Sequence, residues 1–181
     1  MVRVLSFDVG CINFAYCLME TTPTPRVLEC GKKRLGDART PIDRLIGEMH
    51  RYLSATPATA PPAQWDAVLI EQQVGRSSPK NYGLGAALYM YYVGFTGVDL
   101  QFVCPRTKFT KLARCDDVPG IVEMRGELRA ARGKALKALS IKCTRILAAH
   151  WGCDVLEEKL RTVIKKDDIA DSFLYCATYS M

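Results

Sequence analysis

The chain has 181 residues, of which 49% are hydrophobic and 24% are charged. This size supports one globular domain with a proper core and argues against two full domains. The net charge of +6 favours a polyanionic partner, with nucleic acid as the leading candidate.

The first part of the chain predicts three strands and a helix. Residues 2–8 alternate weakly in hydrophobicity, and residues 14–20 and 26–33 follow after short turns, so the first two strands form a hairpin. Thr40 suits a helix N-cap and Pro41 the first helical position. The apolar residues that follow recur at helical spacing and give one buried face: Ile42, Leu45, Ile46, Met49 and Leu53.

The rest of the chain alternates strands with helices. Residues 65–71 form a short apolar run, which is typical of a central parallel strand covered on both faces. The uncharged stretch 81–98 contains four glycines and four tyrosines, so it predicts a buried or half-buried helix rather than a membrane span. The remaining expected elements are a strand over 98–104, an irregular segment over 106–126, one long helix over 127–150 and a last helix over about 166–179.

The resulting order is β-β-β-α-β-α-β-α-α. Hairpin strands first and helix-connected strands later predict an α/β domain over residues 1–181, with a mixed five-stranded sheet flanked by helices. No internal repeat and no low-complexity tract divides the chain.

Four carboxylates occupy positions that are unfavourable for an unpaired charge. Asp8 ends the apolar run 2–7, and Glu71 ends the apolar run 67–70. An acid at the end of a hydrophobic strand destabilises the fold unless a cation meets it. Asp168 and Asp171 are three residues apart, which places both on one face of the last helix, about 5–6 Å apart at Cβ.

Hard divalent cations prefer carboxylate oxygens, and two such ions about 3.5–4 Å apart support in-line hydrolysis at phosphorus. The four acids therefore predict a divalent-metal site and, in a basic chain, an enzyme that cuts nucleic acid. A simpler interpretation is that acids in the first turn of a helix only complement its dipole. That interpretation suffices for Asp167.

Three segments resemble the motifs of the RuvC-like Holliday junction resolvases of the ribonuclease H-like superfamily. Ser6–Gly10 is similar to the first motif, Val68–Gln72 to the second with its Glu-Gln pair, and Lys166–Ser172 to the last. The resemblance covers nearly the whole chain. The compact size and the Lys-Lys-Asp-Asp run resemble the resolvases of poxviruses and related large DNA viruses more than those of fungal mitochondria.

The resemblance implies a ribonuclease H-like fold and an endonuclease that cuts four-way DNA junctions by symmetric paired nicks, during viral concatemer or recombination processing. Asp8, Glu71, Asp168 and Asp171 would hold two Mg²⁺ ions per active site, with Mn²⁺ as a substitute. The enzyme would be a homodimer, and the stretch 81–98 is its expected interface.

The family also has a basic residue shortly after the strand that follows the second helix. The segment Cys104–Lys108 resembles that site. Lys108 is the expected contact of the scissile phosphate or of the attacking water, and Lys111 is the alternative.

Other polar residues are candidates for contacting DNA. The loop 75–81 carries donors suited to phosphates and lies close in sequence to Glu71, so we expect it to enter the junction centre. A run of positive charges is otherwise often only a solvated helix face. The expected DNA-binding residues are Gln72, Arg76, Lys80, Lys111, Arg132, Lys165 and Lys166.

Three other functions compete with junction resolution. A nuclease of the same fold would act on other branched DNA or on RNA–DNA hybrids, and only the DNA-binding surface separates the two. The spacing of Asp8, Gly10 and Asn13 also resembles the phosphate motif of actin-like sugar kinases and ATPases, but the chain is too short for them. A non-catalytic DNA-binding protein would not need the four acids.

The eight cysteines form no Cys-x-x-Cys pair, so a zinc ribbon is not expected. Neither a secretory signal nor an Arg- and Ser-rich leader is visible, and the thiols are expected to be reduced. We therefore expect an intracellular, reducing location without membrane association. For a viral protein this is the host cytoplasm at the viral factory, with the virion or the nucleus as alternatives.

Overall fold

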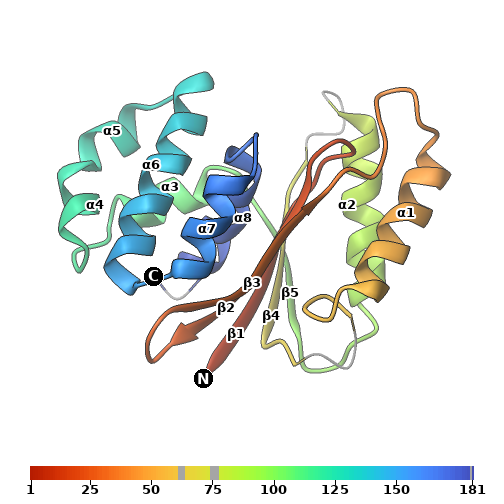
Figure 1. Cartoon of the computed structure of the whole chain (residues 1–181), viewed down its shortest axis with the longest axis horizontal. Coiled ribbons are helices and arrows are strands. Elements are labelled where there is room, and N and C mark those ends of the chain that lie inside the picture. The colour runs from red at the N-terminus through yellow and green to blue at the C-terminus, as the bar shows by residue number, and fades with distance from the viewer. Residues whose placement is uncertain (61–63, 74–77, 180) are drawn as a thin grey trace.

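The computed structural model describes residues 1–60, 64–73, 78–179 and 181. A mixed five-stranded sheet runs through the centre of the molecule in the order β3-β2-β1-β4-β5 (Figure 1). β1 pairs antiparallel with β2, and β2 with β3, whereas β4 pairs parallel with both β1 and β5. The strands are β1 (Val2–Asp8), β2 (Phe14–Thr22), β3 (Arg26–Lys33), β4 (Ala67–Glu71) and β5 (Asp99–Val103). The predicted α/β class with a mixed five-stranded sheet is confirmed.

Helices cover both faces of the sheet (Figure 1). Helices α1 (Ile42–Ala55) and α2 (Pro79–Tyr92) lie on one face. The helices on the other face are α3 (Thr107–Leu112), α4 (Pro119–Glu123), α5 (Arg125–Ala130), α6 (Lys134–Trp151), α7 (Asp154–Thr162) and α8 (Asp167–Ala177). The sheet therefore separates two hydrophobic cores, which is the usual arrangement when parallel strands are buried on both sides.

The period-2 alternation of β1 assigns its side chains to these two cores. Leu5 and Phe7 are fully buried in the core under α1 and α2. Val4 packs into the core under α8, and the Ser6 hydroxyl donates to the Ser172 carbonyl of α8 at 2.5 Å. By the same alternation, the next residue on the α8 side is the strand's terminal acid.

Helix α8 is the central helix of its layer. It packs against β1, β2 and α6, and nearly all of its residues are buried, its two N-terminal acids included. A helix that is apolar on most sides is stable only when it is enclosed in this way. Its first turn is therefore held firmly against the sheet.

The region 106–162 corrects three expectations. The segment expected to be irregular contains α3 and α4, and the single helix expected over 127–150 is broken into α5 and α6. Gly133 separates them with φ +55, a backbone conformation that L side chains rarely adopt. Helix α7 was not predicted, because its buried face consists only of Leu156 and Leu160. Gly152 ends α6 in the left-handed conformation, as expected.

The structure also differs from the sequence-based expectations at the start of α1 and at the end of α2. The N-cap of α1 is Pro41 rather than Thr40, whose hydroxyl instead bonds with Asp37 in the preceding turn. Helix α2 ends at Tyr92, before the glycine-containing end of the uncharged stretch. Among the described residues, no helix is long and apolar enough to cross a membrane.

Candidate active site

Two of the four acids meet at the ends of neighbouring parallel strands. Ser6 of β1 pairs in register with Leu69 of β4, and both point toward α8. Two residues later on each strand, Asp8 and Glu71 lie next to each other at the same sheet edge and on the same face. Strand pairing and alternation alone thus bring together two residues that are 63 positions apart.

Asp8 experiences the combined negative charge of the cluster. Burial raises its pKa well above the usual value, and the charge and the hydrogen bond of Glu71 raise it further. The charges of Asp171 and Asp168 act in the same direction. All four predicted ligands are therefore close enough to interact electrostatically. Among the described residues, no ion pair involves Asp8 or Glu71.

Asp168, in contrast, is neutralised by two lysines. Its Oδ2 atom lies 2.7 Å from Lys32 Nζ of β3, and its Oδ1 atom lies 3.1 Å from Lys165 Nζ. The Lys32 and Asp168 side chains are 17% and 8% exposed, so this ion pair is shielded from solvent. Buried pairs of this kind are destabilising to break, because the remaining charge stays behind unpaired.

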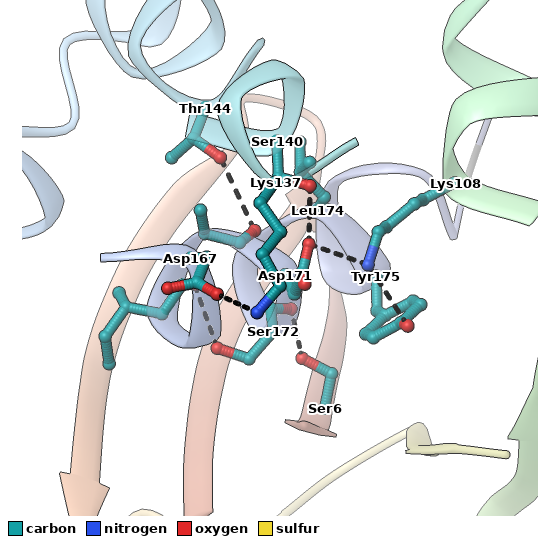
Figure 2. A network of polar contacts seen from close by, with 12 residues as sticks. Ser6, Lys108, Lys137, Ser140, Thr144, Asp167, Asp171, Ser172, Leu174 and Tyr175 are labelled. Atoms are coloured by element: carbon teal, nitrogen blue, oxygen red, sulfur yellow. Dashed lines mark hydrogen bonds and ion pairs between the residues drawn. The ribbon is translucent and has the colours of Figure 1, made fainter. Parts of the chain in front are cut away.

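Asp171 is held from two directions (Figure 2). Its Oδ1 atom accepts a hydrogen bond from the Ser140 hydroxyl of α6 at 2.6 Å and lies 2.8 Å from Lys108 Nζ of α3. The Lys108 side chain is only 3% exposed. A lysine is rarely buried so completely unless its ammonium has a partner.

Tyr175 completes the environment of this lysine. Lys108 Nζ donates to the Tyr175 hydroxyl at 3.1 Å and lies 4.2 Å from the centre of the ring. Burial, followed by the charges of Glu71, Asp171 and Asp8, raises the pKa of Tyr175 well above its usual value. Because an ammonium can only donate, the Tyr175 hydroxyl oxygen is the acceptor of this hydrogen bond. The ring and the hydroxyl of Tyr175 therefore both hold the Lys108 ammonium in place.

Asp167 points away from Asp171 and Lys108 and toward Lys137 of α6 (Figure 2). Burial raises its pKa, but the hydrogen bond from Lys137 at 2.9 Å and the charge of Lys165 outweigh burial, so the pKa lies below its usual value. This agrees with the expectation that Asp167 has a structural role at the start of α8.

The donor set fits a hard divalent ion, because such ions prefer carboxylate oxygens and the other three acids lie close enough to Asp8 to act on it electrostatically. As the side chains stand, no three Asp, Glu, His or Cys residues of the described chain are grouped closely enough to hold an ion. The carboxylate oxygens of Asp168 and Asp171 instead pair with Lys32, Lys165 and Lys108.

Comparisons with known proteins rest on structure, since no family model and no curated protein sequence matches the chain. The fowlpox virus Holliday junction resolvase aligns over 98% of this chain and 96% of its own, with a TM-score of 0.61 and 18% identity. RuvC of Thermus thermophilus, in complex with a Holliday junction substrate, aligns over 99% and 95%, with a TM-score of 0.64 and 13% identity. The yeast mitochondrial resolvase aligns over 98% and 78%, with a TM-score of 0.66 and 16% identity.

The chain has the RuvC-like resolvase fold. The ribonuclease H-like sheet predicted from the three motifs is confirmed, and the alignments extend over nearly the whole chain. In this fold Asp8 and Glu71 lie at the carboxyl ends of the central strands β1 and β4, and Asp168 and Asp171 lie in the first half of α8.

The resolvase fold places Lys108 and Lys111 differently, although both are on α3. Lys108 enters the acidic cluster, where its Nζ atom lies 2.8 Å from Asp171 Oδ1. Lys111 donates to the carbonyl oxygens of Thr178 and Tyr179, at 2.7 and 3.3 Å, and so satisfies the C-terminal end of α8. Of the two candidate lysines, only Lys108 contacts a motif acid.

The expected DNA-binding residues are dispersed. Lys165 pairs with Asp168, and Lys166 precedes α8 as its half-buried N-cap residue. Gln72 is exposed just after β4 and lines a groove beside α2. Arg76 lies outside the described residues, together with residues 75 and 77 of the loop 75–81. Residues 79–81 are not loop but the first turn of α2.

Two further candidates have local structural contacts. Lys80 donates to the carbonyl oxygens of Ala38 and Thr40, at 2.6 and 2.7 Å, and ties α2 to the turn before α1. Arg132 lies between α5 and α6 and donates to the carbonyl oxygens of Arg129 and Ala131, at 2.8 Å each.

Sequence reasoning missed three residues that contact the acids of α8, namely Lys32, Lys137 and Ser140. It also missed Tyr175, which contacts Lys108. A signal existed only for Tyr175, which follows Asp171 by four residues and so lies on the same helix face. Lys32 and Ser140 come from β3 and α6, and nothing in the sequence places those elements beside α8.

The two sides of the cluster predict opposite effects on stability. At pH 7 in the absence of divalent ions, Asp8→Asn should raise the free energy of unfolding by about 1 kcal/mol or more, roughly 2–4 °C in Tm. Asp168→Asn should lower it by about 2 kcal/mol, because Lys32 would lose its shielded partner. Urea and thermal unfolding of both variants measure the difference.

The gain from Asp8→Asn should also depend on pH. In the unfolded chain Asp8 ionises near pH 4, whereas its raised pKa keeps the proton bound to higher pH in the folded chain. Wild-type stability should therefore fall relative to the variant as the pH rises from about 4, and the two should converge below it. A pH-independent gain, or a loss, would contradict the assigned electrostatics.

Proposed function

We propose that this chain is a Holliday junction resolvase, a metal-dependent and structure-selective DNA endonuclease that cuts four-way junctions by symmetric paired nicks. The observation that carries the proposal is the meeting of Asp8, Glu71, Asp168 and Asp171 at one sheet edge, with the buried Lys108 among them. Three solved structures of the same fold are Holliday junction resolvases. The net charge of +6 suits a DNA partner.

The proposed cofactor is Mg²⁺, replaceable by Mn²⁺, with two ions per active site held by Asp8, Glu71, Asp168 and Asp171. The bound ions would activate a water and neutralise charge that develops on the phosphate oxygens. Lys32 and Lys165 would then release Asp168, and their ammonium groups would be free for the DNA backbone.

The protein's own part in catalysis centres on Lys108. Its ammonium is a donor at the carboxylate cluster, and contacts with Asp171 and Tyr175 fix its position. A donor fixed before the reaction stabilises developing negative charge without reorganisation. We assign Lys108 to the scissile phosphate or to the attacking water.

Cleavage of a synthetic four-way junction tests the proposal directly. With Mg²⁺ the protein should make paired symmetric nicks, and EDTA should abolish them, while linear duplex, splayed arms and an RNA–DNA hybrid remain largely intact. Asp8→Asn should bind the junction but not cut it, and since this variant is expected to be more stable, unfolding would not explain the loss. Cutting confined to the flap or hybrid substrates would instead support the alternative nuclease function.

The two lysines of α3 predict separable defects. Lys108→Met should reduce the single-turnover cleavage rate by about 100-fold or more, with the junction Kd changed little. Lys111→Met should retain most of the rate but lose about 1 kcal/mol of stability, because it removes a cap of α8. The reverse pattern would show that the lysine assignment is wrong.

We further propose that the enzyme is a homodimer that associates through α2. The helix carries no charged residue after Lys80, and beside it lies a groove of about 280 Å³. The lining residues are Gln72, Gln73, Tyr82, Gly85, Ala86, Tyr89, Met90 and Phe102. Tyr82, Met90 and Phe102 are 58%, 68% and 45% exposed, which is unusual for large apolar side chains unless a partner covers them.

Met90→Asp should shift the protein from dimer to monomer in sedimentation experiments and should uncouple the two nicks. Its fold should be unaffected, because Met90 faces solvent in the single chain. Val155→Asp is the matched control, since Val155 of α7 is 49% exposed on the other side of the sheet. A wild-type monomer, or a dimer that survives Met90→Asp, would refute this interface.

A further inference from the structure

A positively charged pocket lies beside the acidic cluster of the candidate active site, on the other side of α3. Helices α3 and α5 pack against each other, and a pocket of about 340 Å³ opens between them. Phe109 and Leu128 are its buried apolar floor. Its polar lining consists of Arg106, Thr110, Arg114 and Arg129, all of which are exposed.

The arginines gather here because of helical spacing. Arg106, Thr110 and Arg114 are four residues apart and follow one face along α3. Backbone hydrogen bonds continue the helical turns at both ends, from Thr110 N to Arg106 O and from Arg114 N to Lys111 O. Arg129 reaches the same pocket from the last turn of α5.

No acid balances these charges. The pocket lining contains no carboxylate, and within the described part of the chain none of the three guanidinium groups has an ion pair. Like charges at one pocket repel each other, so the arrangement becomes favourable when an anion binds between them. The guanidinium fork matches the geometry of a phosphate group, which it can bind in a bidentate manner.

The arginine pocket and the acidic cluster lie on opposite sides of α3. Lys108 leaves the opposite face of α3, about 200° around the helix from Arg106 at 3.6 residues per turn, and reaches Asp171. A single helix, about 10 Å across, thus separates the scissile-phosphate side from the arginine pocket. That separation is within the reach of one DNA strand.

We propose that Arg106, Arg114 and Arg129 form a phosphate-binding site that holds the DNA backbone a short distance from the cut. This rests on the proposed function for its DNA partner. The site positions a junction arm through the backbone and reads no base. The same chemistry would also accept a free phosphate, and the experiment separates the two sources.

The test compares two triple variants in the Asp8→Asn background, which prevents cleavage. One replaces Arg106, Arg114 and Arg129 with Gln. The charge-matched control replaces three exposed arginines on the other side of the sheet, Arg39, Arg44 and Arg51, with Gln. Both changes lower the net charge by the same amount, and thermal unfolding checks that both proteins are folded.

Fluorescence anisotropy gives the junction Kd between 50 and about 300 mM salt. The pocket variant should bind about 10-fold or more weakly, and the slope of log Kd against log salt should fall by about 2–3, since each phosphate contact contributes about 0.9. The control should change Kd by less than about 3-fold. Equal losses in both variants, or no loss in the pocket variant, would overturn the site.

A phosphate titration without DNA tests the phosphate site separately from the proposed resolvase function. Inorganic phosphate titrated into the arginine-labelled protein should shift the Nε–Hε NMR signals of the three arginines saturably, and the pocket variant should lack those signals. If the parent fails to bind a junction but the signals shift, the proposed function fails and the phosphate site stands. Phosphate binding together with unchanged junction affinity would overturn the DNA assignment, and no shift at all would overturn the site.

Discussion

The structure depends on the need to place four carboxylates close together inside a folded chain. Asp8 and Glu71 end adjacent parallel strands and face the same side, so strand pairing keeps their backbones close together. Helix α8 adds two more acids from above the same sheet edge. Such repulsion opposes folding, and the protein tolerates it only by supplying cations around the cluster.

The cationic partners are distributed unequally among the four acids. Lys32 and Lys165 neutralise Asp168, and Lys108 neutralises Asp171, whereas the pKa of Asp8 is raised by burial and by its acidic neighbours. Within the described part of the chain, lysines therefore pair with the two acids of α8, whereas no lysine or arginine pairs with the two acids of the strands. This asymmetry favours a divalent ion at the strand side and links stability, pH and metal binding in one site.

The fold tolerates wide sequence variation because its requirements are mainly geometric. Identities of 13–18% accompany TM-scores of 0.61–0.66 in resolvase structures from a virus, a bacterium and a yeast mitochondrion. Strand order, alternation and a buried α8 can be met by many apolar sequences. The α2 groove and the arginine pocket are formed by side chains of this chain, and fold alone does not assign their function.

The sequence by itself determined the sheet and the site acids. Period-2 alternation identifies β1, the ends of apolar runs mark Asp8 and Glu71, and a three-residue helical spacing joins Asp168 to Asp171. These are local patterns, which a single segment carries within itself. Tertiary structure alone decided which lysines meet the acids, because Lys32 and Lys108 reach them from separate elements across 136 and 63 residues. The orientation of α3 turns Lys108 toward Asp171 and Lys111 toward the end of α8, and packing rather than sequence spacing sets that orientation.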